Sequence, residues 1–136
     1  MREYVLDAYA LVRFFRKTPG FMTMRKLVQQ AKDGQANLTM SVVNLGETLY
    51  VLARYFGEEE AMKCIESARD AVAMISVGDR QALDAALLRL HYKLGLADCF
   101  AAELAMRTGA TLVTADPEFA KLGKQLKVLA LPRHSG

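Results

Sequence analysis

The chain has 136 residues, the length of one domain that buries about two-thirds of its unfolded surface. Hydrophobic residues make up 52% and charged residues 24%, and the net charge of +3 is a mild bias that by itself indicates no partner. No apolar run approaches the roughly 20 residues that cross a bilayer, and Glu3 and Asp7 interrupt the stretch that a secretory signal would need. We therefore expect one cytoplasmic domain over residues 1–136 with no membrane association.

The first half of the chain predicts two strands and four helices. The patterns indicate a strand at 4–6, helices at 8–16 and 20–34, a strand at 36–41, and helices at 42–56 and 58–71. Gly34 is expected to cap the C-terminus of the second helix, and Ser41 the N-terminus of the third. A short apolar strand followed at once by a helix is typical of an α/β unit.

The second half repeats this alternation. It predicts a strand at 72–77, helices at 80–95 and 97–109, a strand at 110–114, a short helix from 117 and a strand at 126–131. Asp79 is expected to cap the first of these helices, Gly109 to end the second and Pro117 to open the third. Strands that alternate with helices predict an α/β sandwich around a parallel sheet.

Cys64 and Cys99 lie within helical patterns, so we interpret them as unpaired core residues. These cysteines and the two histidines, His91 and His134, are too scattered to predict a structural zinc site. Neither histidine is assigned a role, because no spacing places it near the acidic residues described next.

Four acidic residues stand where strands end or helices begin. Asp7 follows the first strand, Asp116 follows the fourth, Asp98 lies in a first helical turn, and Glu47 lies about two turns into its helix. Ligands of parallel sheets bind at the carboxyl ends of strands, where the winding reverses. Neighbouring first and fourth strands would therefore bring these carboxylates together at one edge.

Each acid also has a simpler interpretation. Aspartate is a preferred N-cap, which accounts for Asp7, Asp98 and Asp116 one at a time, and Glu47 could be a solvated helix position. The joint pattern is more informative, because several carboxylates at one edge repel one another unless a cation compensates. Oxygen ligands of this kind suit Mg²⁺ or Mn²⁺, and one or two such ions can activate water against a phosphodiester.

The segments "YVLDAYAL", "NLGETL", "LADCFAAELAMRTGATLVTADPEF" and "LKVLAL" together resemble PIN-domain ribonucleases, in particular the small VapC-type toxins of toxin–antitoxin pairs. The resemblance covers nearly the whole chain in the expected order. One departure is that Ala97 and Cys99 flank Asp98, where many relatives have an aromatic residue before the acid and alanine after it.

The resemblance implies a three-layer α/β/α sandwich with a five-stranded parallel sheet in the order 3-2-1-4-5. It implies that Asp7, Glu47, Asp98 and Asp116 form a pocket for Mg²⁺ or Mn²⁺, with Ser41 and Thr114 as supporting hydroxyl residues. Asp7, Asp98 and Asp116 would hold the metal, and Glu47 would hold a second ion or orient the attacking water. The expected activity is endonucleolytic cleavage of RNA that leaves a 5′-phosphate.

The expected partners are the RNA substrate, a cognate antitoxin protein and a second copy of the chain. Neutralising four of the 15 acidic residues would leave 11 against 18 basic ones, enough for a phosphate-binding surface. Candidates for RNA binding are Arg13, Arg16, Lys17, Arg89 and Lys93, with Lys121 and Lys124 as further options and solvated helix faces as the simpler interpretation. Phe14, Phe15, Phe21, Met22 and Met24 could form an interface or belong to the core. No aromatic and basic run in the sequence indicates base-by-base readout.

Four other functions have less support in the sequence. A haloacid-type phosphatase would need an aspartate at the position of Tyr9, and a receiver domain would need an acid pair near its first strand, where the chain has only Asp7. No glycine-rich phosphate-binding loop supports a nucleotide enzyme. The remaining alternative is a catalytically inactive PIN-like module that binds RNA or protein, which the presence of all four acids disfavours.

Overall fold

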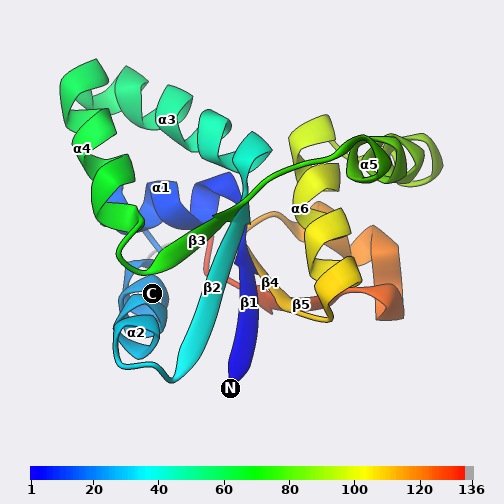
Figure 1. The fold of residues 1–136 in the computed structure, drawn as a ribbon, viewed down its shortest axis with the longest axis horizontal. Helices are drawn as coiled ribbons and strands as arrows, with labels where there is room; N and C mark the ends of the chain where they lie inside the picture. The colour runs from blue at the N-terminus through cyan, green and yellow to red at the C-terminus, as the bar shows by residue number, and fades with distance from the viewer. Residues whose placement is uncertain (134–136) are drawn as a thin grey trace.

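The computed structural model describes residues 1–133, and Figure 1 shows the fold. The strands are β1 Arg2–Leu6, β2 Ala36–Ser41, β3 Val72–Ile75, β4 Thr111–Thr114 and β5 Lys127–Ala130. The helices are α1 Ala8–Arg16, α2 Phe21–Lys32, α3 Val42–Phe56, α4 Glu58–Ala68, α5 Asp79–Tyr92, α6 Leu96–Thr108 and the 3₁₀ helix η1 Pro117–Gln125. The predicted alternation of strands and helices is confirmed throughout.

The five strands form one parallel sheet in the order β3-β2-β1-β4-β5, as the resemblance implied. The central strand β1 pairs with β2 on one side and with β4 on the other. Leu6 at the end of β1 is in register with Val113 in β4. The residues that follow these two strands therefore emerge side by side at the carboxyl edge of the sheet.

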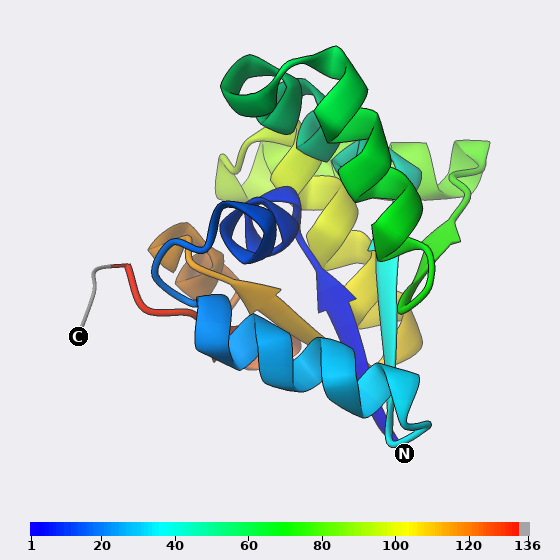
Figure 2. The same cartoon turned by 90° about the vertical axis from the view of Figure 1, so that its left-hand side faces the viewer.

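Helices cover both faces of the sheet. Figure 2 shows α2 across one face with α6 behind the strands, in agreement with Figure 1. Successive residues of a strand point to opposite faces, so Leu6 packs into a core with α1 and α2 while Val5 packs into a core with α6 and η1. Burial on both faces explains why the strands are continuously apolar in sequence.

Gly34 ends α2 as predicted, with a left-handed φ of 74° immediately after the C-cap Asp33. Two details differ from the predictions. The helix α5 begins at Asp79 with Gly78 as its N-cap, because the side chain of Gln81 accepts a hydrogen bond from the Gly78 N–H at 3.0 Å. The segment after Asp116 is a 3₁₀ helix broken at Gly123, whose left-handed φ of 56° bends the chain toward β5.

The cysteines and the large apolar residues singled out in the sequence differ in how deeply they are buried. Both cysteines are free, with Cys99 buried and Cys64 half-buried. Met24 is fully buried, and Met22 is exposed. The phenylalanines are half-buried, with the Phe14 ring 5.1 Å from Phe15 and 5.8 Å from Phe21. Within residues 1–133 no helix has the length and apolar character needed to cross a membrane.

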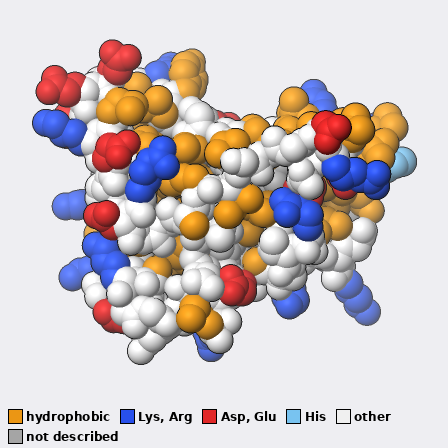
Figure 3. Space-filling model, in the orientation of Figure 1, with side chains coloured by type: hydrophobic (Ala, Val, Ile, Leu, Met, Phe, Trp, Pro, Cys, Tyr) orange, Lys and Arg blue, Asp and Glu red, His pale blue; other side chains and the backbone are white. Residues whose placement is uncertain are grey.

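The helix α5 carries apolar side chains that the fold does not cover. Leu83, Leu87 and Leu90 are 63%, 52% and 70% exposed, and Ala85 is its one buried residue. Figure 3 shows hydrophobic side chains gathered at the right of the molecule, where Figure 1 places α5. These leucines recur at spacings of four and three, so they share one face of the helix.

Candidate active site

Asp7 is the buried acid of the site. It follows β1 and caps α1, where its Oδ1 accepts a hydrogen bond from the Ala10 N–H at 2.9 Å. Burial raises the pKa of Asp7 from 3.8 to about 6, although hydrogen bonds from Thr114 and Ala10 lower the pKa and the charge of Glu47 raises it further. The cap explanation is therefore correct but incomplete, because a cap alone does not require burial beside other carboxylates.

Asp116 lies beside Asp7 because β4 is the neighbour of β1. Its carboxylate caps η1 by accepting a hydrogen bond from the Glu118 N–H at 2.9 Å. Its own N–H donates to the Thr114 hydroxyl at 3.0 Å. The Thr114 side chain is 1% exposed and also hydrogen-bonds Asp7, so one buried hydroxyl joins the two strand ends.

Asp98 approaches from the first turn of α6 and is half-buried. Burial, followed by the charges of Asp116, Asp7 and Glu47, raises its pKa from 3.8 to about 7. A hydrogen bond between the Asp98 and Asp116 side chains contributes in the same direction. This carboxyl group therefore holds a proton far more readily near neutral pH than an ordinary aspartate does.

Glu47 reaches the same pocket from α3. The helix begins at Val42, and the hydroxyl of its N-cap Ser41 accepts a hydrogen bond from the Val43 N–H at 3.2 Å, as predicted. Glu47 is half-buried rather than fully solvated, and burial raises its pKa. All four predicted acids therefore line one pocket, together with Tyr9, Arg13, Ala115, Pro117 and Arg133.

The donor set fits a hard divalent cation, because it consists of carboxylate oxygens whose mutual repulsion such an ion would relieve. Among residues 1–133, no three His, Cys, Asp or Glu side chains are already close enough to form a ready metal-binding group. The arrangement observed instead has Asp98 hydrogen-bonded to Asp116. Asp7, Glu47, Asp98 and Asp116 would hold such an ion, and its charge would favour the ionised forms of these carboxyl groups.

Asn44 is a site residue that the sequence reasoning missed. It lies one turn before Glu47, is fully buried, and donates from Nδ2 to the Ala97 carbonyl at 3.1 Å. This bond ties α3 to α6 at the residue before Asp98. Within residues 1–133, its Oδ1 has no hydrogen-bond partner. The sequence did contain a signal for Asn44, because it is a polar residue at a core position of the helix, three residues before the candidate acid Glu47.

The predicted basic residues do not gather at one place. Arg13 lines the pocket, but its guanidinium donates to the carbonyls of Pro19 at 2.9 Å and Pro132 at 2.6 Å. Arg133, which was not predicted, also lines the pocket. Arg89 is exposed on α5, and Lys17 and Lys93 are the left-handed C-caps of α1 and α5.

The other residues singled out lie away from the acids. Lys121 contacts Glu118 at 3.4 Å, and Lys124 is exposed in the last turn of η1. His91 is exposed near the end of α5, and His134 lies outside the described residues.

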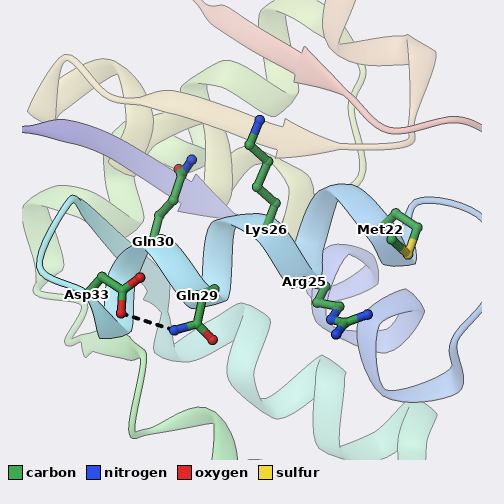
Figure 4. A pocket seen from close by; sticks show the side chains of 6 residues that line it. All are labelled: Met22, Arg25, Lys26, Gln29, Gln30 and Asp33. Carbon is green, nitrogen blue, oxygen red and sulfur yellow. Dashed lines mark hydrogen bonds between the residues drawn. The ribbon is translucent and has the colours of Figure 1, made fainter.

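A second hollow runs along α2 (Figure 4). Its side chains all come from this one helix, and the close-up shows Lys26 and Gln30 extending to one side and Arg25 and Gln29 to the other. Gln29 is bonded to Asp33 at 3.1 Å. Because no second element contributes a group to it, this hollow lacks the convergent polar side chains of a binding site.

The fold and the pocket define a class: small α/β proteins that place a cluster of carboxylates at the switch point of a parallel sheet. The sequence of residues 4–125 matches the PIN domain family, so the chain belongs to that family. No curated protein matches the sequence.

Solved structures share the fold at low sequence identity. VapBC2 from Rickettsia felis, solved bound to a promoter DNA fragment, has a TM-score of 0.77 and 18% identity, covering 96% of this chain and 99% of its own. VapC20 from Mycobacterium tuberculosis, a Sarcin-Ricin loop cleaving toxin, has a TM-score of 0.74 and 16% identity, and the match covers 96% of this chain and 99% of VapC20. DNA-bound VapBC from Salmonella typhimurium has a TM-score of 0.73 and 15% identity, and the match covers 96% of this chain and 98% of the matched chain.

Proposed function

We propose that the protein is an endoribonuclease that uses Mg²⁺ or Mn²⁺ and serves as the toxin of a toxin–antitoxin pair in the cytoplasm. The observation that carries this proposal is the convergence of Asp7, Glu47, Asp98 and Asp116 on one pocket. Three of them have raised pKa values, which is the expected signature of carboxylates arranged for a cation rather than for stability. Membership of the PIN domain family supports the nuclease class.

The metal would be held by Asp7, Asp98 and Asp116, with Glu47 available for a second ion. When bound, such an ion supplies charge stabilisation for the phosphate and lowers the pKa of an attacking water. Glu47, which reaches the pocket from α3 and is left free if the three aspartates hold one ion, would orient the attacking water. Thr114 fixes Asp7 relative to Asp116, and Asn44 fixes the start of α6 under Asp98.

The partners proposed are RNA, an antitoxin protein and a second copy of this chain. Structural neighbours support the antitoxin: VapBC2 from Rickettsia felis and VapBC from Salmonella typhimurium were solved bound to DNA, and a neighbour from Klebsiella pneumoniae is a toxin–antitoxin complex. The exposed leucines of α5 support self-association, because three large apolar side chains on one helix face are costly to leave in water.

The test is cleavage of single-stranded RNA in the presence of Mn²⁺. We expect cleavage by the wild-type protein, none with excess chelator and none by Asp7→Asn. Asp70→Asn, at an exposed position next to α4, is the matched control and should cleave normally. Cleavage retained by Asp7→Asn or in chelator would reject the site. A protein that binds RNA without cleaving any sequence offered would instead support the inactive PIN-like module.

A further inference from the structure

An aromatic and basic surface adjoins the acidic pocket. It consists of Tyr9 and Arg16 from α1 and Tyr50, Arg54 and Tyr55 from α3, and we name it the aromatic track. Tyr9, Tyr50 and Tyr55 are 48%, 63% and 56% exposed. No run in the sequence indicates this surface, because folding brings it together from two helices that pack against each other.

Contacts between the two helices order the track. The Arg16 guanidinium lies 3.5 Å from the centre of the Tyr55 ring and so joins the last turn of α1 to the last turn of α3. The Arg54 guanidinium lies 5.8 Å from the centre of the Tyr50 ring. Stacked in this way, aromatic and guanidinium planes are held in place before any ligand arrives, which reduces the entropy lost on binding.

The track begins at the pocket itself. Tyr9 lines the pocket with Asp7 and Glu47, and Tyr50 lies one helical turn beyond Glu47. Tyr9 and Arg16 are seven residues apart and so share one face of α1. A chain that enters the pocket and continues along this face would therefore meet Tyr9 first and Arg16 with Tyr55 later.

We infer that the aromatic track binds unpaired bases of the RNA on one side of the bond that is cleaved, an inference that rests on the proposed function. Every base has a face that stacks on tyrosine or arginine, and each arginine can also contact phosphate. Such a surface selects single strands, because bases within a duplex are stacked on one another. RNA is favoured over a protein partner because Tyr9 makes the track continuous with the acidic pocket, where the proposed cleavage takes place.

The test is binding of a fluorescently labelled single-stranded oligoribonucleotide to the wild-type protein in chelator, where no cleavage occurs. Stacking on tyrosine contributes about 1–3 kcal/mol per base, so we expect Tyr55→Leu to weaken binding by about 5- to 100-fold. Tyr55→Phe keeps the ring and should bind within about twofold of wild type. The chain has five tyrosines and no tryptophan, so bound RNA should also quench tyrosine emission, and Tyr55→Leu should reduce that quenching.

Charge is tested by a matched pair of exposed arginines. Arg16→Ala should weaken binding and lower its salt dependence, while Arg25→Ala on α2, outside the track, should bind as wild type. Unchanged RNA binding by Tyr55→Leu overturns the inference and indicates a protein-docking role for the surface. Equal losses for single-stranded and duplex RNA, or a Tyr55→Phe defect as large as that of Tyr55→Leu, also overturn it. If the wild-type protein cleaves RNA and Tyr55→Leu binds RNA normally, the RNA-binding role of the aromatic track is rejected and the nuclease proposal stands. If RNA binding depends on Tyr55 but no RNA is cleaved, the nuclease proposal is rejected and the role of the aromatic track stands.

Discussion

The hydroxyl of Thr114 hydrogen-bonds the carboxylate of Asp7 across the junction of β1 and β4. The same hydroxyl accepts the backbone N–H of Asp116 at 3.0 Å. One side chain thus fixes the spacing of two acids that follow different strands. Because Thr114 is 1% exposed, water cannot replace it without rearrangement of the strand ends.

We expect Thr114→Val to lower RNA cleavage by about 10- to 100-fold, the usual effect of removing a group that orients a metal ligand. Thr114→Ser retains the hydroxyl and should recover most of the activity. The comparison is made under single-turnover conditions with Mn²⁺ at several concentrations. Equal activities for Thr114→Val and Thr114→Ser would show that the methyl packing, rather than the hydroxyl, is what matters.

Without a metal ion, the protein should be less stable at higher pH. The pKa of Asp7 is about 6 and that of Asp98 about 7, both above the value of 3.8 expected in an unfolded chain. The folded state therefore binds more protons between pH 4 and 7, and the free energy of unfolding falls as pH rises through this range. Urea titrations in chelator at about pH 5 and about pH 8 measure the effect.

Mg²⁺ or Mn²⁺ should reverse that trend, because a bound cation favours the ionised carboxylates. Stability in the presence of saturating metal should then rise, or stay level, as pH increases from about 5 to about 8. Stability that rises with pH in chelator would contradict the burial of ionisable acids in the pocket.

Asn44→Leu should reduce activity with little change in stability. Leucine removes the hydrogen bond to the Ala97 carbonyl, which lowers the free energy of unfolding by about 1 kcal/mol. It also removes the buried Oδ1 atom that has no partner within residues 1–133, which raises the free energy of unfolding by about the same amount. The start of α6 would lose its tie to α3, which should weaken Mn²⁺ binding. Thr48→Val is the control, since the Thr48 hydroxyl donates within α3 to the Asn44 carbonyl at 2.7 Å. An Asn44→Leu protein that binds Mn²⁺ as wild type does would remove Asn44 from the site.

Leu87→Glu should convert a dimer into a monomer. Leu87 lies at the centre of the exposed leucine face of α5, and burying a charge there without a partner is unfavourable. Light scattering after size-exclusion chromatography measures the mass directly. Met62→Glu, at an exposed position on α4, should leave the mass unchanged. A wild-type monomer would reject self-association, and a Leu87→Glu dimer would place the interface on another surface.

The sequence predicts the fold better than it predicts the details of the site. Strand and helix patterns are strong because both faces of the sheet are buried, so Val5 and Leu6 are apolar although they face different layers. The positions of Asp7 and Asp116 follow once β1 and β4 are neighbours. The prediction that Asp79 caps α5 was wrong. The side chain of Gln81 accepts a hydrogen bond from the N–H of Gly78, three residues earlier, and Gly78 rather than Asp79 is the N-cap.

Other features depend on contacts that no local pattern contains. Asn44 and Ala97 are 53 residues apart in the chain, and Tyr55 meets Arg16 only after α1 packs on α3. The role of Arg13 is likewise set by Pro132, far along the chain, whose carbonyl accepts its hydrogen bond. Side-chain chemistry of this kind becomes visible only when the helices are placed in space.

We expect the four carboxylates, which come from separate elements, to bind one divalent cation together, and calorimetric titration with Mn²⁺ measures this binding. Two variants at first-turn helix acids should be compared: Asp98→Asn in the pocket and Asp79→Asn on the exposed start of α5. We predict saturable binding by the wild-type protein and by Asp79→Asn, and binding at least about tenfold weaker by Asp98→Asn. Equal Mn²⁺ affinity in all three proteins would contradict the account.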